Sequence, residues 1–317
     1  MRPRSALACK GEAVEEWIDL RFFRPLGHAV ARALLAGPVT ADQVTAASLA
    51  LGLAAGHLFF YRSPALNALG LALFVASDVL DSADGQLARL RGASTRFGRI
   101  LDGVSDNLRF INLYAHLLAR LVAGGAGPGV LALALAAGLS HSLQSAAVDF
   151  MRQAYLRLGV GSGSELDLPE TLGRRREASW ARRVGAALYR DYVRRQAWLF
   201  PRTVALVRAA EAEGAGVLAG YRARLAPPVA RCAWLGQNLR FALLGLTALP
   251  GWPALFFWIT LGPLNLVLLA LVRAQEREAA ALLGSGAAPA PTPEPGLAAG
   301  VVSAAGPAPV RRHVQPA

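Results

Sequence analysis

Residues 64–87, PALNALGLALFVASDVLDSADGQL, are long and apolar enough to cross a membrane, yet three aspartates lie in the second half of this stretch. A membrane span needs about 20 predominantly apolar residues. Five further stretches meet the same requirement: 43–60, 98–123, 127–150, 230–249 and 252–272. We therefore expect an all-α integral membrane protein with six transmembrane helices.

The composition of the whole chain agrees with a membrane location. Of its 317 residues, 54% are hydrophobic and only 17% are charged, which is too apolar for an ordinary water-soluble domain. The net charge of +12 suits anionic lipid head groups or nucleotides. Nucleic acid binding could also explain this charge, but a basic stripe interleaved with aromatic residues, as such binding requires, occurs only within 152–224. We therefore expect no nucleic acid partner. The two cysteines match no metal or redox spacing, and we see no removable signal peptide.

The arginines predict how the chain is oriented. Loops after the second and fourth spans contain Arg89, Arg91, Arg96 and a long basic run that starts at Arg152, whereas the other loops hold at most Arg62. Basic residues are enriched in cytoplasmic loops. An even number of spans places both termini on one side, so we expect the termini, the arginine-rich loops and the aspartates to face the cytoplasm, in a bacterial inner membrane.

We divide the chain into an N-terminal interfacial segment, two groups of spans, an insert and a disordered tail. Their bounds are 1–36 for the interfacial segment, 37–150 for spans one to four with the catalytic motif, 151–229 for the cytoplasmic arginine-rich insert, 230–275 for the last two spans and 276–317 for the tail. The insert has fourteen arginines against seven acids. Its apolar residues favour amphipathic helices on the membrane surface; a solvated helical hairpin without lipid contact is the alternative.

Four aspartates, Asp81, Asp84, Asp102 and Asp106, lie at or near the ends of two apolar spans. Each would cost roughly 2.5–3.5 kcal/mol at the centre of a membrane helix, so bound cations are the natural compensation. The spacing within each pair places both members on one helix face. Carboxylate ligands without His or Cys favour a hard ion, Mg²⁺ or Mn²⁺. Two such ions can bind a diphosphate.

Small residues lie close to these acids. Gly85 and Ala88 follow Asp84 on the next turn, and Gly98 opens the next span. Their small size allows a ligand or a neighbouring backbone to come close. Plain helix packing explains Gly98 as well, but Arg89 beside the acids favours a ligand, because its guanidinium can contact a phosphate with two hydrogen bonds.

The segments DSADGQLAR, residues 81–89, and GRILDGVSD, residues 98–106, together resemble the signature of the CDP-alcohol phosphotransferase (CDP-alcohol phosphatidyltransferase) family. The resemblance implies that Asp81, Asp84, Asp102 and Asp106 hold two metal ions. It also implies that Asp106 deprotonates the acceptor hydroxyl; a role only as the fourth metal ligand is the alternative.

The resemblance also implies the residues that bind the CDP donor. STRFG, residues 94–98, looks like the corresponding loop of phosphatidylinositol-phosphate and phosphatidylglycerophosphate synthases, the nearest branch in motif. GPVTADQVT, residues 37–45, is similar to the cytidine-side stretch of the family, with Ala41 in place of the usual proline. The implied donor-binding residues are Asp42, Gln43, Val44, Thr45, Gly85, Ala88, Arg89 and Thr95.

The expected reaction is metal-dependent transfer of a phosphatidyl group from a CDP-linked lipid, CDP-diacylglycerol, to an alcohol acceptor with release of CMP, in phospholipid biosynthesis. A soluble CDP-alcohol donor with a lipid acceptor is one alternative. A transporter and an inert membrane scaffold are the others. Expected partners are the CDP-linked donor, a small or lipid alcohol and membrane lipids; homodimerisation follows from the resemblance only. His57, His116 and His141 have no partner at i+4, and we expect them to serve in packing.

Overall fold

Every regular element in the described part of the chain is helical, in this computed structural model. The structure describes residues 14–92, 96–161, 166–172, 180–213, 217–218 and 220–285, with the backbone alone at 96–102 and 180–182. Its elements are η2 (Asp19–Phe23), α1 (Arg24–Leu34), α2 (Ala41–Leu58), α3 (Pro64–Leu90), α4 (Arg96–Ala123), α5 (Gly129–Tyr155), η3 (Leu156–Val160), α6 (Trp180–Leu199), α7 (Pro201–Ala212), α8 (Tyr221–Arg231), η4 (Cys232–Leu235), α9 (Gln237–Ala248), α10 (Pro253–Leu261) and α11 (Pro263–Gly284).

Helices α2 and α3 form a hairpin that begins with a well-capped helix. The Thr40 hydroxyl accepts a hydrogen bond from the Gln43 N–H, and the Gln43 side chain accepts one from the Thr40 N–H. This reciprocal pair satisfies two of the amide groups that a helix start leaves open. Ser63 caps α3, with Pro64 at its first position. The caps fix where α2 begins, and therefore where residues 42–45 lie.

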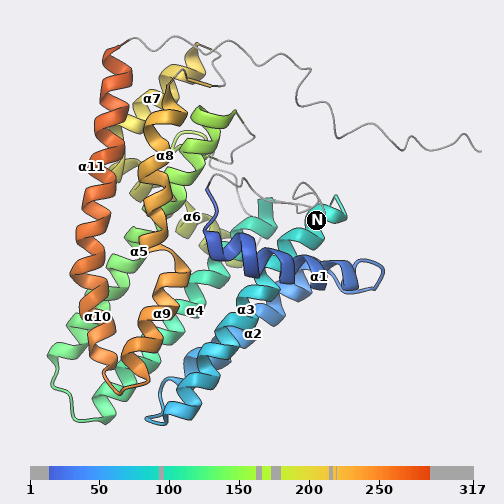
Figure 1. The fold of residues 1–317 in the computed structure, drawn as a ribbon, viewed down its shortest axis with the longest axis vertical. Helices are drawn as coiled ribbons and strands as arrows, with labels where there is room; N and C mark the ends of the chain where they lie inside the picture. Colours follow the sequence, from blue (N-terminus) through green and yellow to red (C-terminus); the bar gives the residue numbers. More distant parts are fainter. Residues whose placement is uncertain are drawn as a thin grey trace, which may run out of the picture.

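Helix α1 lies across the α2–α3 pair instead of along it (Figure 1). Gly27 permits this crossing, because a Cβ atom there would lie 2.6 Å from Oγ of Ser82. The Gln86 amide donates a hydrogen bond to the carbonyl of Arg24 at 3.0 Å. Helix α1 is therefore docked on the half of α3 that carries the aspartates, in the crosswise orientation expected of an interfacial helix.

Three helical segments in the described chain are long and apolar enough to cross a membrane: Pro64–Leu90, Gly129–Val160 and Pro253–Gly284. They indicate an integral membrane protein, and the count of six spans stays a prediction. Helix α4 is long, with 28 residues, but contains Arg99, Asp102, Asp106 and Arg109 near its beginning. Helix α2 has only 18 residues.

The stretch 230–249, expected as one span, is not one continuous helix. Gly236 has extended backbone angles, φ −74° and ψ 168°, and separates η4 from α9. The 12 residues of α9 rise about 18 Å, against a hydrocarbon core of about 30 Å. A Cβ atom on Gly236 would lie 1.9 Å from Oε1 of Glu16, so this break accommodates the N-terminal segment.

The insert packs on two helices that extend beyond their expected ends. Helix α5 continues through η3 to Val160, and α11 continues to Gly284, so residues 276–284 are helical and the tail expected from 276 begins too early. Their extensions share a hydrophobic core with α7 and α8 that includes Met151, Val207, Tyr221 and Leu282. Glu276 of α11 accepts hydrogen bonds from the first amide groups of α7. These contacts stabilise the part of α11 that continues past its expected end.

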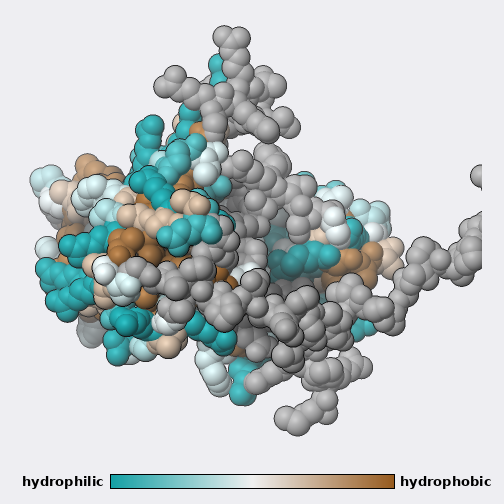
Figure 2. Space-filling view, turned by 90° about the horizontal axis from the view of Figure 1, so that it is seen from above, coloured by the Kyte–Doolittle hydropathy of each residue, from teal (hydrophilic) through white to brown (hydrophobic). Residues whose placement is uncertain are grey.

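Hydrophilic residues cover much of the described surface at this end of the molecule, with smaller hydrophobic patches between them (Figure 2). The buried face of α7, with Val204 and Val207, contacts protein and is not free for lipid. On α6, Leu188 and Trp198 are exposed. The membrane-surface interpretation of the insert therefore concerns α6 and not α7.

Candidate active site

One buried guanidinium gathers carboxylates from two helices. Arg109, on α4, is 3% exposed. Its Nη1 atom donates to Oδ1 of Asp78 at 3.1 Å, and its Nη2 atom donates to Oδ1 of Asp81 at 2.9 Å. Nη2 also contacts Oδ1 of Asp106, one turn earlier on α4. Asp81 and Asp106, two of the four expected metal ligands, therefore converge on a single cationic atom.

The neighbouring helices hold Arg109 in this position. Its Nη1 atom also donates to Oγ of Ser77 at 2.8 Å. Gly52 of α2 makes room for the side chain, since a Cβ atom there would lie 2.3 Å from Cδ of Arg109. From α9, the Gln237 amide donates to Oδ1 of Asp78 at 2.6 Å. Three helices besides α4 thus support the carboxylates around Arg109, and Asp78 belongs to this network.

Access to solvent differs among these three carboxylates. The exposed fraction of the side chain is 12% for Asp78, 28% for Asp81 and 41% for Asp106. Asp78 is therefore enclosed between Arg109 and Gln237, whereas Asp106 can be reached from outside. An accessible carboxylate held by a cation can contact a second molecule, and an enclosed one cannot.

Asp84 has a different environment, although it is only one turn from Asp81. It is buried, and the Thr45 hydroxyl donates to its Oδ2 atom at 2.5 Å. Val44, the preceding residue, packs with Ala83 and Leu87 of α3. The N-terminal turn of α2 thus lies directly against the second aspartate of the motif. Asp42 and Gln43 are exposed beside it, with Gln43 engaged in the helix cap.

The loop before α2 is held by an arginine of the motif region. Nη1 of Arg91 donates to the carbonyl of Val39 at 2.6 Å, and Nη2 donates to the carbonyls of Leu34 and Gly37 at 2.8 and 3.0 Å. Arg91 therefore fixes the approach of residues 42–45 to α3. By contrast, Arg89 folds back over Gly85 on its own helix, with Nη1 3.4 Å from the position of a Gly85 Cβ. Gly85, Ala88 and Arg89 all lie partly accessible on this turn.

Two of the expected residues lie outside what the structure describes. Thr95 is not among the described residues, and for Asp102 only the helical backbone is described. Asp102 is one turn before Asp106 on α4, so the helix places both on neighbouring turns. Among the described side chains, no group of three His, Cys, Asp or Glu residues is arranged to hold a metal ion.

The donor chemistry of the site nevertheless suits a hard divalent cation. Asp81 and Asp106 already direct one oxygen each to the same positive atom of Arg109. The acids in the motif supply only oxygen ligands, the type that Mg²⁺ and Mn²⁺ prefer. Asp84 would contribute an oxygen from the side of Thr45. These residues fit a divalent ion by the chemistry of their ligand atoms, and two of them, Asp81 and Asp106, also converge.

The sequence patterns missed several residues that the structure brings to the site. Gly52, Arg109 and Gln237 lie outside the motif, and each reaches it through a contact between distant parts of the chain. Arg109 alone carried a signal: a charged residue one turn after Asp106 in an apolar stretch needs a partner. The histidines expected to be isolated also meet, since Nδ1 of His57 and Nε2 of His116 are 3.0 Å apart.

Comparison with known proteins agrees with the motif. A search of curated proteins finds no match to the chain. Residues 38–162 match the model of one protein family, CDP-alcohol phosphatidyltransferase. The matched range begins at the loop held by Arg91 and includes α2 to α5 with the aspartate cluster. Residues 38–162, the part of the chain that contains the aspartate cluster, are therefore similar to the CDP-alcohol phosphatidyltransferase family.

Proposed function

We propose that this protein transfers a phosphatidyl group from CDP-diacylglycerol to an alcohol and releases CMP, as a step of phospholipid biosynthesis. The similarity of residues 38–162 to the CDP-alcohol phosphatidyltransferase family supports a transferase that uses a CDP-alcohol. The observation that carries the proposal is the convergence of Asp81 and Asp106 on one cationic atom, with the stretch 42–45 held against Asp84. The site thus combines a place for cations with a neighbouring surface for the nucleotide.

In this proposal the four aspartates of the motif would hold two Mg²⁺ or Mn²⁺ ions, whose positive charge would offset the negative charge of the diphosphate and favour attack at its phosphorus. Asp81 and Asp84 supply ligands from α3, and Asp102 and Asp106 supply ligands from α4. Arg109 is a positioning residue: it holds Asp81 and Asp106 at a fixed separation, and Asp78 and Gln237 keep it there.

Asp106 also accepts the proton of the acceptor hydroxyl. Its side chain is the most exposed of the three around Arg109, so an alcohol can approach it. The alcohol oxygen then forms a bond to the phosphorus of the donor, the bond from that phosphorus to CMP breaks, and CMP leaves with the electron pair. A carboxylate is a weak base for an alcohol, so this role depends on the positive charges around it.

The remaining motif residues bind the donor. Arg89 contacts a phosphate of the diphosphate, and Gly85 and Ala88 allow the nucleotide to approach α3. Thr95, which comes directly before α4 in the sequence, contacts the donor. Asp42, Gln43, Val44 and Thr45 form the cytidine side. Arg91 and the Thr40 cap hold those four residues in place, so the nucleotide side is preorganised by contacts that do not involve the donor.

Release of CMP by the purified protein tests the proposal. The assay contains CDP-diacylglycerol, Mg²⁺ and a panel of alcohols, with Asp106→Asn beside the wild type. Asp191→Asn, an exposed aspartate of α6 paired with Arg195, is the matched control. We expect release that needs Mg²⁺ and one particular alcohol, that persists in Asp191→Asn and that is lost in Asp106→Asn. No release from folded wild-type protein with any acceptor would contradict CDP-diacylglycerol as the donor.

A further inference from the structure

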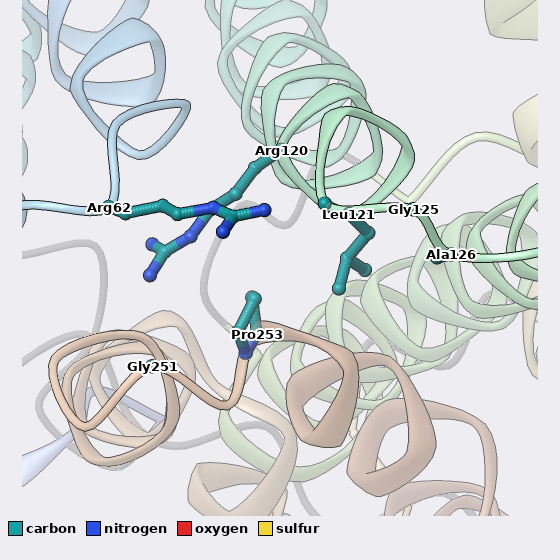
Figure 3. Close-up of a pocket in the computed structure, with 8 residues that line it drawn as sticks. Arg62, Arg120, Leu121, Gly125, Ala126, Gly251 and Pro253 are labelled. Carbon is teal, nitrogen blue, oxygen red and sulfur yellow. The ribbon is translucent and has the colours of Figure 1, made fainter.

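A cavity lined by two arginines lies at the end of the bundle opposite the aspartates. Its volume is about 410 Å³, and the loops α2–α3, α4–α5 and α9–α10 meet around it. Arg62 and Arg120 supply its charged groups, and Leu121 and Pro253 are among its apolar lining residues (Figure 3). The cavity therefore belongs to neither the motif nor the donor side of the site.

Arg120 is buried, and none of the partners that it contacts in the described part of the chain is acidic. It is 6% exposed, and its Nη1 atom donates to Oδ1 of Asn67 at 2.7 Å and to the carbonyl of Phe59 at 3.4 Å. Both acceptors are neutral. The sequence offers no alternative, because residues 43–77, 107–148 and 214–275 contain no Asp or Glu. A buried cation with only neutral partners leaves most of its charge uncompensated.

Arg62 brings a second positive charge to the same cavity. Its guanidinium lies against Gly124, where a Cβ atom would be 2.4 Å from Nη2. Glycine at 124 thus lets Arg62 turn inward over the cavity, and the side chains of Arg62 and Arg120 extend past each other in Figure 3. Two like charges that line one cavity repel each other, so an anion between them would lower the energy of both.

The chemistry of the lining selects the kind of anion. Guanidinium groups form paired hydrogen bonds to phosphate oxygens, and two of them from different loops can contact a tetrahedral anion on two sides. The cavity has room for a phosphate with the first atoms of its substituents. Tyr61 and Trp252 are exposed next to it, and such aromatic residues are typical of the level of the lipid head groups.

We propose that this cavity is a phosphate-binding site, filled by the head-group phosphate of an anionic lipid or by free phosphate. Arg62 and Arg120 bind the phosphate oxygens, and Gly124 holds Arg62 in the binding position. The site is separate from the transfer reaction, because its residues come from the opposite ends of α2, α3 and α4.

Thermal unfolding of the purified protein in a neutral detergent tests the site with inorganic phosphate as the probe. Sodium chloride at equal ionic strength controls for screening. We compare the wild type with Arg62→Gln, which removes an exposed charge, with Gly124→Ala, which displaces Arg62 without removing a charge, and with Arg231→Gln. Arg231 is an exposed arginine of α8 and serves as the matched control.

We expect phosphate to raise the Tm of the wild type and of Arg231→Gln by the same amount, and to raise the Tm of Arg62→Gln and Gly124→Ala by less than half as much. Equal rises in all four proteins, or an equal rise with chloride, would overturn the proposal. Arg120→Gln is not the main test, because Arg120 also holds Asn67 and the carbonyl of Phe59.

A second arm separates the two sources of phosphate. The same proteins are unfolded in nanodiscs of phosphatidylcholine with and without phosphatidylglycerol, in phosphate-free buffer. A Tm rise with phosphatidylglycerol that depends on Arg62 identifies a lipid head group, and a rise with inorganic phosphate alone identifies the free anion. If neither probe acts through Arg62, the cavity is not a phosphate site.

Discussion

Three arginines are buried among the described residues, Arg109, Arg120 and Arg240, and the surroundings of Arg109 and Arg240 differ. Arg109 is 3% exposed and contacts three carboxylates. Arg240 of α9 is 2% exposed; its Nη2 atom donates to Oε1 of Gln144 at 2.7 Å, and its Nη1 atom makes no hydrogen bond to any described residue. The same side chain is therefore the centre of a charge network in one place and an uncompensated charge in the other.

The comparison shows that burial of an arginine does not by itself indicate a functional site. A buried ion pair gains little over apolar packing, but removal of one partner leaves a charge that is costly. Around Arg109 the carboxylates need a cation, from the chain or from solution. Around Arg240, no carboxylate of the described residues forms an ion pair with the guanidinium. Substitution should separate the two cases.

The largest effect is expected from Arg109→Met, which leaves Asp78, Asp81 and Asp106 without their common partner. We expect a loss of up to about 3 kcal/mol in the free energy of unfolding without divalent ions, less than for a fully buried network because two carboxylates are partly exposed. Mg²⁺ should restore more stability in this variant than in the wild type, as measured by denaturant titration in detergent.

Arg109→Lys is the control for Arg109→Met, because it keeps a positive charge. It should lose less than half as much stability. If Arg109→Met is as stable as the wild type, with and without Mg²⁺, the carboxylates do not need this cation.

Gly52→Ala should displace Arg109 without changing any charge. The added Cβ atom would lie 2.3 Å from Cδ of Arg109, and overpacking of this kind costs about 1–3 kcal/mol. CMP release should fall more steeply than stability, because the guanidinium no longer holds Asp81 and Asp106. Gly129→Ala is the control, because a Cβ atom there would meet open space. It should leave both CMP release and the free energy of unfolding unchanged. If Gly52→Ala kept full activity, Arg109 would not be needed to position Asp81 and Asp106.

Thr45→Val should have a smaller effect, because it removes a single hydrogen bond, from the uncharged hydroxyl of Thr45 to Asp84. We expect a loss of about 1–2 kcal/mol, since the buried carboxylate loses its donor. Thr45→Ser keeps the hydroxyl and should retain most of the stability. The Mg²⁺ concentration that gives half-maximal CMP release should rise in the valine variant alone. An unchanged Mg²⁺ dependence would argue against Asp84 as a ligand next to Thr45.

Arg240→Met is expected to give the smallest effect. It removes an uncompensated buried charge, while Gln144 keeps its hydrogen bonds to the carbonyl of Thr260 and to Asn265. The free energy of unfolding should change by less than about 1 kcal/mol or increase. If Arg240→Met lost as much free energy of unfolding as Arg109→Met, the two arginines would not differ as described. Arg240 would then have an anionic partner.

The sequence was enough to predict helices, an integral membrane protein and the similarity of residues 38–162 to a known family, because these depend on local hydropathy and a short motif. It also predicted that residues 42–45 belong near the aspartates, where Thr45 now contacts Asp84. It did not predict Gly52, Gln237 or the meeting of His57 with His116, which depend on how distant helices pack.

The packing of the insert also could not be predicted from the sequence. Amphipathic patterns in residues 180–212 identify an apolar face but not its partner, and for α7 that partner is the extension of α11. The break at Gly236 has a similar cause, because the glycine makes room for Glu16, more than two hundred residues earlier in the chain. Contacts of this length leave no periodic signal.

The most direct test of the central claim measures CMP and lipid product together. Purified protein is incubated with CDP-diacylglycerol and the alcohol that the panel identifies, with Mg²⁺ or with EDTA, and mass spectrometry quantifies CMP and the new phosphodiester. We predict equal amounts of the two from the wild type with Mg²⁺, and neither from Asp106→Asn or in EDTA. CMP without a new phosphodiester, or product formation by Asp106→Asn at the wild-type rate, would contradict transfer at the aspartate cluster.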